Sequence, residues 1–147
     1  MDNPWEDARR HEDDERSTKI KQELIQAANE SVKEVADKLT SLGFSVTRLD
    51  SSLMPLFNLQ VVRGNSMYLV DVMRRSAFAS DYWIAKKQLE LWKEEYTAAT
   101  KIVAFNIKNT SCRYILVGNI EQVAIDKRGK GSLHIRFEDT KPLDLLP

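Results

Sequence analysis

Residues 56–73 read LFNLQVVRGNSMYLVDVM. Two runs rich in β-forming residues, 56–63 and 66–73, flank the dipeptide Gly64-Asn65. This dipeptide readily supplies the positive φ angles of a tight turn between two strands. The stretch therefore predicts an antiparallel β-hairpin.

The residues before the hairpin predict a long helix and one strand. From Thr18 onward, apolar residues recur at spacings of three and four, as they do along one face of a helix. They are Ile20, Leu24, Ala28, Val32, Val35, Leu39 and Leu42. Gly43 suits a left-handed C-terminal cap, so we expect the helix to end there. Residues 44–49 alternate apolar and polar side chains as a half-buried strand does, and a turn-rich loop follows at 50–55.

The residues after the hairpin predict a second helix and further strands. A helical pattern returns over 81–97, with Ser80 or Asp81 as a possible N-cap. Residues 102–107 form a nearly continuous apolar run, which is typical of an interior strand. Strands are also expected at 114–117 and 132–137, joined through the turn-prone residues 127–131. A helix that crosses from the hairpin to an interior strand implies a parallel pairing, so we expect a mixed sheet covered by both helices.

Composition places the chain among soluble proteins of one domain. Its 147 residues leave no room for a second full domain, and 42% hydrophobic with 30% charged residues is ordinary for a globular protein. No apolar run approaches the ~20 residues of a membrane span, and no signal-peptide pattern begins the chain, so we expect a cytoplasmic protein. The single cysteine, Cys112, can form neither an internal disulfide nor a cysteine-based zinc site.

The net charge of zero hides an asymmetry along the chain. Residues 1–17 carry seven acids against three arginines, so this segment is −4 and the remainder is +4. We expect an acidic, flexible N-terminal arm at 1–17 and a single domain at 18–147. Two interpretations of the arm stay open, a solvated terminus or a segment that competes for a basic surface.

Three stretches resemble the PD-(D/E)XK nuclease superfamily, and within it the archaeal Holliday junction resolvases and related small nucleases. They are LGFSVTR at 42–48, LVDVMRR at 69–75 and KQLELW at 87–92. The resemblance covers residues from about 20 to 118. It implies a restriction-endonuclease-like α/β fold with an αβββαβ core, and cleavage of phosphodiester bonds with magnesium.

The catalytic motif of that family is largely replaced in this chain. An acid on each hairpin strand holds the metal ion in the family, and a nearby lysine helps to position water. The resemblance places Asn58, Asp71 and Met73 at these positions. Asn58 offers an oxygen without charge, and Met73 can neither donate a hydrogen bond nor carry charge. Because only Asp71 matches in chemistry, the motif argues against ordinary metal-dependent cleavage.

Catalysis survives in the sequence only if other residues replace the lost groups. Lys86 or Lys87 is placed where some relatives carry a displaced lysine, and Lys87 would then act with Asp71. Glu34 of the first helix would join Asn58 and Asp71 as a magnesium ligand. The alternatives are a solvated strand residue for Asp71 and an exposed helix residue paired with Lys38 for Glu34.

Basic residues follow the hairpin and suggest a binding surface. Arg74, Arg75, Lys86 and Lys87 could contact phosphates, as could the turn that contains Lys127, Arg128 and Lys130. Ordinary solvated charges explain both groups equally simply.

The leading hypothesis is a nuclease-fold protein with a degenerate active site, which binds nucleic acid (DNA or RNA) or a protein partner and needs no cofactor. One alternative is an active, magnesium-dependent, structure-selective DNA endonuclease. Another is a dimerising structural module, for which Trp83, Trp92 and Tyr96 would supply exposed apolar surface. Resemblance of fold cannot choose among these, because one scaffold hosts many functions.

Overall fold

The computed structural model describes residues 4–49, 56–75, 81–107, 111–126 and 131–147, without the side chains of residues 4–14, 75 and 81. The chain divides into two compact units between Glu30 and Ser31. No helix in these ranges combines the length and the apolar character needed to span a membrane.

The first unit contains most of helix α1 (Pro4–Ser41). The helix begins well before Thr18, so residues 4–17, which we expected to form a flexible arm, are helical. Their arginines and glutamates are good helix formers, and proline is favoured in a first helical turn. The apolar stripe predicted from Ile20 onward is solvated at its start, because Ile20 and Leu24 are 56% and 63% exposed.

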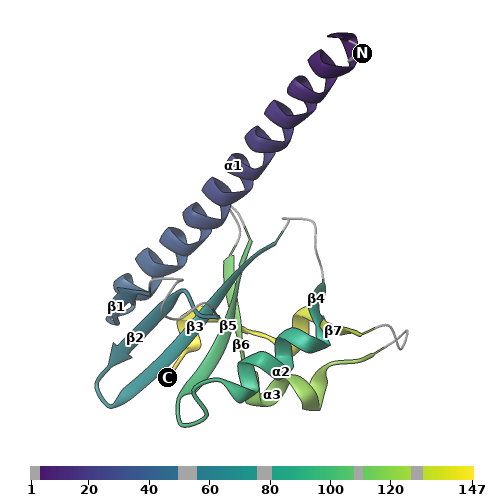
Figure 1. Cartoon of the computed structure of the whole chain (residues 1–147). Helices are drawn as coiled ribbons and strands as arrows, with labels where there is room; N and C mark the ends of the chain where they lie inside the picture. Colours follow the sequence, from purple (N-terminus) through teal and green to yellow (C-terminus); the bar gives the residue numbers. More distant parts are fainter. Residues whose placement is uncertain (1–3, 50–55, 76–80, 108–110, 127–130) are drawn as a thin grey trace. The chain divides into compact units, whose positions relative to one another are not determined.

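The second unit contains a six-stranded mixed sheet. Its strands are β1 (Ser45–Arg48), β2 (Leu59–Arg63), β3 (Ser66–Arg75), β5 (Thr100–Ile107), β6 (Ser111–Leu116) and β8 (Lys141–Pro142). They lie in the order β1-β2-β3-β5-β6-β8 (Figure 1). β2 and β3 form the predicted hairpin, with Gly64 at φ 60°. β3 and β5 are parallel and the other neighbours are antiparallel, which confirms the predicted mixed sheet.

The helix predicted over 81–97 is wrong in its first five residues. These residues form β4 (Asp81–Ala85), and α2 (Lys86–Glu94) begins only after them. β4 pairs antiparallel with β7 (Ser132–Arg136) as a separate two-stranded sheet. In β4, Tyr82 and Ile84 are buried while Trp83 is exposed, so an alternation of period two overrides the helical spacing. The candidate cap Ser80 lies outside the described residues.

The other helices of this unit are short. α3 (Val117–Val123) was not predicted, because its buried residues Val117 and Ile120 give too short a periodic pattern to recognise. Two single-turn 3-10 helices, η1 (Phe137–Asp139) and η2 (Leu143–Leu145), complete the C-terminal segment. Figure 1 shows α2 and α3 side by side.

Each face of the large sheet has its own hydrophobic core, because successive strand residues point to opposite faces. We call the side that packs on residues 31–41 of α1 the α1 face. Its core residues include Val35, Leu39, Val70, Ile102, Leu143 and Leu146. The other side, the α2 face, packs on α2, α3 and the β4–β7 pair. Its core residues include Leu69, Leu89, Trp92, Val103, Phe105 and Ile120.

Helix α1 ends at the glycine that the sequence indicated. Gly43 has φ 93°, its N–H donates to the Thr40 carbonyl at 3.0 Å, and the Phe44 N–H donates to the Leu39 carbonyl at 3.1 Å. This pair of bonds satisfies carbonyls that the helix end would otherwise leave without partners. Buried Phe44 and Leu39 belong to the same core, so the cap also directs the chain into β1.

Candidate functional site

Asp71 lies on β3 and points to the α2 face. Its neighbours Val70 and Val72 pack into the α1-face core, whereas Met73, two residues on, packs on the α2 side. The indole N–H of Trp92 donates a hydrogen bond to Oδ2 of Asp71 at 2.9 Å. Trp92 is fully buried, so this carboxylate is held by a core residue of α2 and is not a solvated strand residue.

Burial governs the electrostatics of this carboxyl group. It raises the pKa of Asp71 to about 6, and the hydrogen bond from Trp92 opposes the rise. Burial penalises the charged form, whereas an N–H donor favours it. At neutral pH the group is therefore mainly ionised, with one oxygen already occupied by the indole.

Asn58 precedes β2 and holds the hairpin together. Its backbone N–H donates to the Val70 carbonyl at 2.8 Å, and its side-chain Oδ1 accepts the Val72 N–H at 2.7 Å. The Asn58 carbonyl accepts the Leu49 N–H at 2.9 Å. The residue thus bonds to the backbone on both sides of Asp71, and its amide oxygen replaces a backbone carbonyl in the ladder.

Glu34 lies on the opposite side of the sheet from Asp71. Its Oε2 accepts a hydrogen bond from Nδ2 of Asn106 at 2.6 Å. Asn106 stands between Phe105 and Ile107, which both pack into the α2-face core, so Asn106 and Glu34 lie on the α1 face. The structure therefore does not bring Glu34 to Asp71.

The expected ion pair between Glu34 and Lys38 is also replaced. Lys38 instead pairs with Asp144, at 2.9 Å between Nζ and Oδ1. The cause is tertiary, because the C-terminal segment packs on this part of α1 and offers a carboxylate that a helix pattern cannot reveal.

The structure does not bring the three residues proposed as magnesium ligands together. Magnesium takes oxygen ligands in near-octahedral geometry, usually including one or two carboxylates. Oδ2 of Asp71 and Oδ1 of Asn58 already accept hydrogen bonds, and the sheet separates both residues from Glu34. Within the described residues, no group of three or more His, Cys, Asp or Glu side chains is placed to hold a metal ion.

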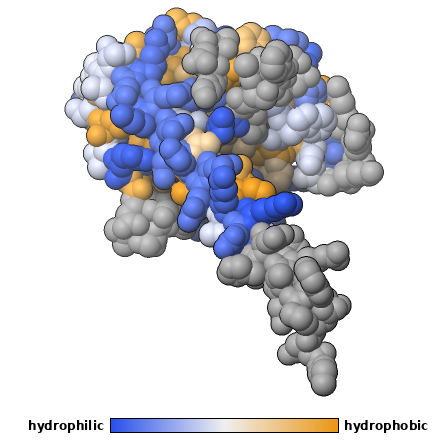
Figure 2. Space-filling view, turned by 90° about the horizontal axis from the view of Figure 1, so that it is seen from above, coloured by the Kyte–Doolittle hydropathy of each residue, from blue (hydrophilic) through white to orange (hydrophobic). Residues whose placement is uncertain are grey.

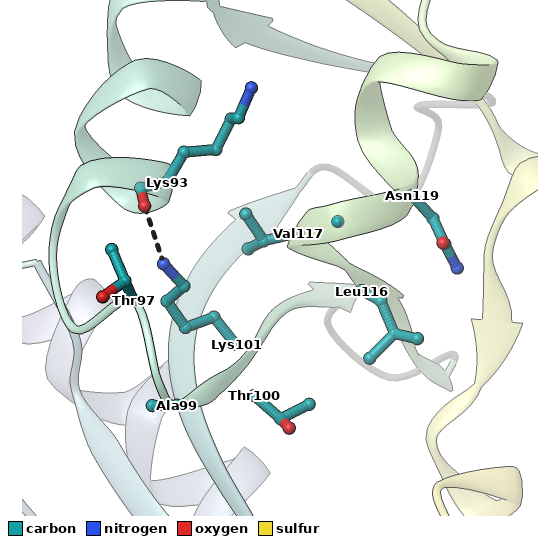
Figure 3. Close-up of a pocket in the computed structure, with 9 residues that line it drawn as sticks. Lys93, Thr97, Ala99, Thr100, Lys101, Leu116, Val117 and Asn119 are labelled. Carbon is teal, nitrogen blue, oxygen red and sulfur yellow. Dashed lines mark hydrogen bonds between the residues drawn. The ribbon is translucent and has the colours of Figure 1, made fainter.

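The lysine that lies on the same sheet face as Asp71 serves a helix end. Lys101 is buried on β5, two residues before Val103, which pairs with Asp71. Its Nζ donates to the carbonyls of Trp92, of Lys93 at 3.3 Å and of Glu95 at 2.8 Å (Figure 3). The cation thereby caps the negative end of α2. Burial lowers the pKa of Lys101.

An open pocket of about 400 Å³ lies beside this lysine, between the end of α2 and the start of α3 (Figure 3). Its two cations are already engaged, because Lys101 bonds to α2 and Lys93 pairs with Glu121 at 2.5 Å. The remaining polar lining comes from Thr97, Thr100 and Asn119. The pocket therefore offers neutral groups to a ligand and no cation without a partner among its lining residues.

The Cys112 thiol is poorly suited to act as a nucleophile or a metal ligand. Burial raises the pKa of the Cys112 thiol to about 12, so the thiol stays protonated at neutral pH. A protonated thiol is a poor nucleophile and a poor metal ligand.

Comparison with known proteins identifies the fold. No family model and no curated protein matches the sequence. Among solved structures, the chain is similar to Hjc of Archaeoglobus fulgidus, a Holliday junction resolvase from an archaeal hyperthermophile, with a TM-score of 0.59. The match covers 80% of this chain and 92% of that chain at 15% sequence identity. The fold is restriction-endonuclease-like. The expected fold class is thus confirmed, and at this identity the likeness is one of fold alone.

In this fold, the basic residues that we expected to bind nucleic acid begin at the end of β3. Arg74 is exposed there, and the side chain of Arg75 is not described. Lys86 and Lys87 are exposed in the first turn of α2, which contains no acid. Figure 2 colours one face by hydropathy, and hydrophobic residues appear on it in small separate patches among hydrophilic ones. Lys127, Arg128 and Lys130 lie outside the described residues.

The three aromatic residues considered for a dimer interface differ in burial. Trp83 and Tyr96 are 46% and 37% exposed, whereas Trp92 is fully buried. Trp92 therefore cannot contribute exposed apolar surface, and that expectation was wrong. The sequence does contain a pattern that indicates this burial. Trp92 follows Leu89 by three residues, so the two lie on the same face of α2, and both are buried.

Proposed function

We propose that this protein has a nuclease fold with a degenerate active site, and that it works by binding nucleic acid without cleaving it. The observation that carries the proposal is the hydrogen bond from the buried indole of Trp92 to Asp71. It engages Oδ2 of the one carboxylate that remains at the motif positions.

The neighbouring motif residues support the loss of cleavage. The Asn58 amide oxygen is used by the Val72 N–H, and Met73 packs against the α2-face core. A nuclease of this kind needs a metal ion to polarise the phosphate and to activate water. The motif positions offer such an ion a single carboxylate, of which Oδ2 already accepts the Trp92 N–H, and no second charged oxygen ligand.

Binding of nucleic acid is supported by the placement of the exposed cations. Lys86 and Lys87 occupy the first turn of α2, where the helix dipole disfavours positive charge and favours anions. The Lys86 N–H bonds to the Gly131 carbonyl, and lysines beside the other N–H groups that a helix start leaves without a partner in the helix are suited to a phosphate group. The similar structure, Hjc, is a Holliday junction resolvase, which makes DNA the first ligand to test.

The test measures cleavage and binding on the same substrates. Purified protein is incubated with a four-way DNA junction, a duplex and a single strand, with magnesium or manganese. We expect no cleavage, together with binding that weakens as salt is raised. Lys87→Glu should weaken binding and reduce the salt slope by about one. The matched control, Lys33→Glu, makes the same charge change at an exposed position of α1 and should leave binding unchanged.

The other outcomes separate the alternatives. Robust cleavage that disappears in Asp71→Ala and in Lys87→Ala would establish an active nuclease with a displaced lysine. Absence of binding to any DNA or RNA at low salt would refute the nucleic-acid proposal and favour a protein partner. A stable dimer that binds no nucleic acid would favour the structural module.

A further inference from the structure

The β4–β7 pair presents an aromatic stack on its outer side. Trp83 and His134 are directly opposite in the antiparallel register, and their rings stack with centroids 4.7 Å apart and an interplanar angle of 27°. His134 is buried, whereas Trp83 is 46% exposed. One face of the indole is therefore supported by the imidazole, and the ring still presents a large area to solvent.

The strands beneath this stack are firmly anchored. Tyr82, Ile84 and Ile135 point to the inner side and are almost completely buried. Tyr82 also stacks on Phe105 of β5, with ring centroids 4.0 Å apart. A tryptophan held on such a support loses little conformational freedom when a flat ligand binds.

The chain around Trp83 leads directly to the exposed lysines Lys86 and Lys87. Ala85 and Ser132, the next outward pair in the register, are small and exposed. The Lys86 N–H donates to the Gly131 carbonyl at 2.8 Å, so the first residue of α2 stays attached to this small sheet. Trp83 and Lys86 are three residues apart, roughly 10 Å along an extended chain.

We propose that the Trp83–His134 stack is a platform for an unpaired base of single-stranded nucleic acid, whose phosphates are contacted by Lys86 and Lys87. The inference rests on the proposed nucleic-acid binding and adds the class of ligand. Aromatic side chains bind single strands through the flat faces of the bases. In a duplex those faces are covered by neighbouring base pairs, so the platform selects unpaired bases.

The experiment compares two substitutions of the same residue. Binding of an oligothymidylate of about 15 nucleotides and of a duplex of equal length is measured by fluorescence anisotropy of a labelled strand. Trp83→Leu keeps apolar cover over His134 but removes the aromatic face, and should lower single-strand affinity about tenfold with duplex affinity unchanged. Trp83→Phe keeps an aromatic face and should stay within about threefold of the wild type.

Intrinsic fluorescence gives a second measurement that a purely structural role would not change. The chain has three tryptophans, so the measurement uses a Trp5→Phe background, in which only Trp83 and the fully buried Trp92 remain. Oligothymidylate should quench the emission of exposed Trp83 in that background. The quenching should be lost in Trp83→Phe, even though that variant still binds the labelled strand.

The negative outcomes are distinct. Equal losses on single strand and duplex in Trp83→Leu, or no loss on either, would overturn the platform while leaving nucleic-acid binding intact. Quenching that persists in Trp83→Phe would also overturn it. A wild-type protein that binds neither ligand would refute the proposed function itself.

Discussion

Replacement of Asp71 by asparagine should stabilise the protein at neutral and alkaline pH. Burial raises the pKa of this carboxyl group from 3.8 to about 6, so folding favours its neutral form. The ionised carboxyl therefore costs folding free energy that appears as the pH rises from about 4 to about 6. Asparagine never carries that charge, and its amide oxygen can still accept the Trp92 N–H.

The expected magnitude follows from the shift. A difference of about two pKa units corresponds to about 3 kcal/mol of unfolding free energy once both pKa values are exceeded, at about pH 8. At about pH 4.5 the same pKa difference lowers the unfolding free energy of the wild type by only about 1 kcal/mol. The stability difference between Asp71→Asn and the wild type should therefore grow by about 2 kcal/mol between these two pH values, in favour of the variant.

Urea unfolding of both proteins at several pH values measures this difference directly. Contributions from groups that the substitution leaves untouched cancel in the comparison, and any fixed effect of the amide shifts all points equally. A stability difference that does not change with pH would refute the argument. A difference that falls as pH rises would show that the charged form is favoured in the folded state, as in a carboxylate prepared to hold a metal.

Three further predictions concern the helices. Lys101→Met keeps the length of the side chain but leaves the carbonyls at the end of α2 without their donor, and should lower the unfolding free energy by about 1–3 kcal/mol in urea. Gly43→Ala should lower the unfolding free energy by about 1–2 kcal/mol. The cause is backbone strain alone, because φ is 93° and the nearest atom to an added Cβ is 3.7 Å away. Its control, Gly118→Ala in α3, should be neutral or slightly stabilising in the same assay. Deletion of residues 1–17 should leave the melting temperature unchanged within about 2 °C, since the described side chains of 15–26 are exposed and the second compact unit begins only at Ser31. A larger drop would show that the deleted segment stabilises the rest of the chain.

The fold could be predicted from the sequence because its decisive signals are local. The Gly64-Asn65 turn, the runs of β-forming residues on either side of it and the glycine after α1 each depend on a few adjacent residues. The parallel pairing of β3 with β5 followed from connectivity, since a helix between two strands places them side by side in the same direction. These features predicted the mixed sheet, and the resemblance of residues 42–48, 69–75 and 87–92 to the nuclease superfamily implied the restriction-endonuclease-like fold.

Elements whose patterns are short or ambiguous were not predicted correctly. Residues 81–85 fit both a helix and a strand by spacing, and pairing with β7, some fifty residues later, decides for the strand. The first helix was expected to begin near Thr18, but in the structure it begins at Pro4. The strand that pairs with residues 81–85, and the residues that extend α1 before Thr18, both lie outside the stretches whose apolar spacing predicted these elements.

The resemblance in the sequence implied motif positions at Asn58, Asp71 and Met73, and of these residues Asn58 and Met73 differ in chemistry from the motif of the nuclease superfamily. Only the tertiary structure decided what the remaining residues do. Periodicity specifies the face of an element on which a side chain lies, but it does not specify which distant element covers that face. The packing of α2 therefore determines that Trp92 bonds to Asp71, and the sheet between them determines that Glu34 cannot.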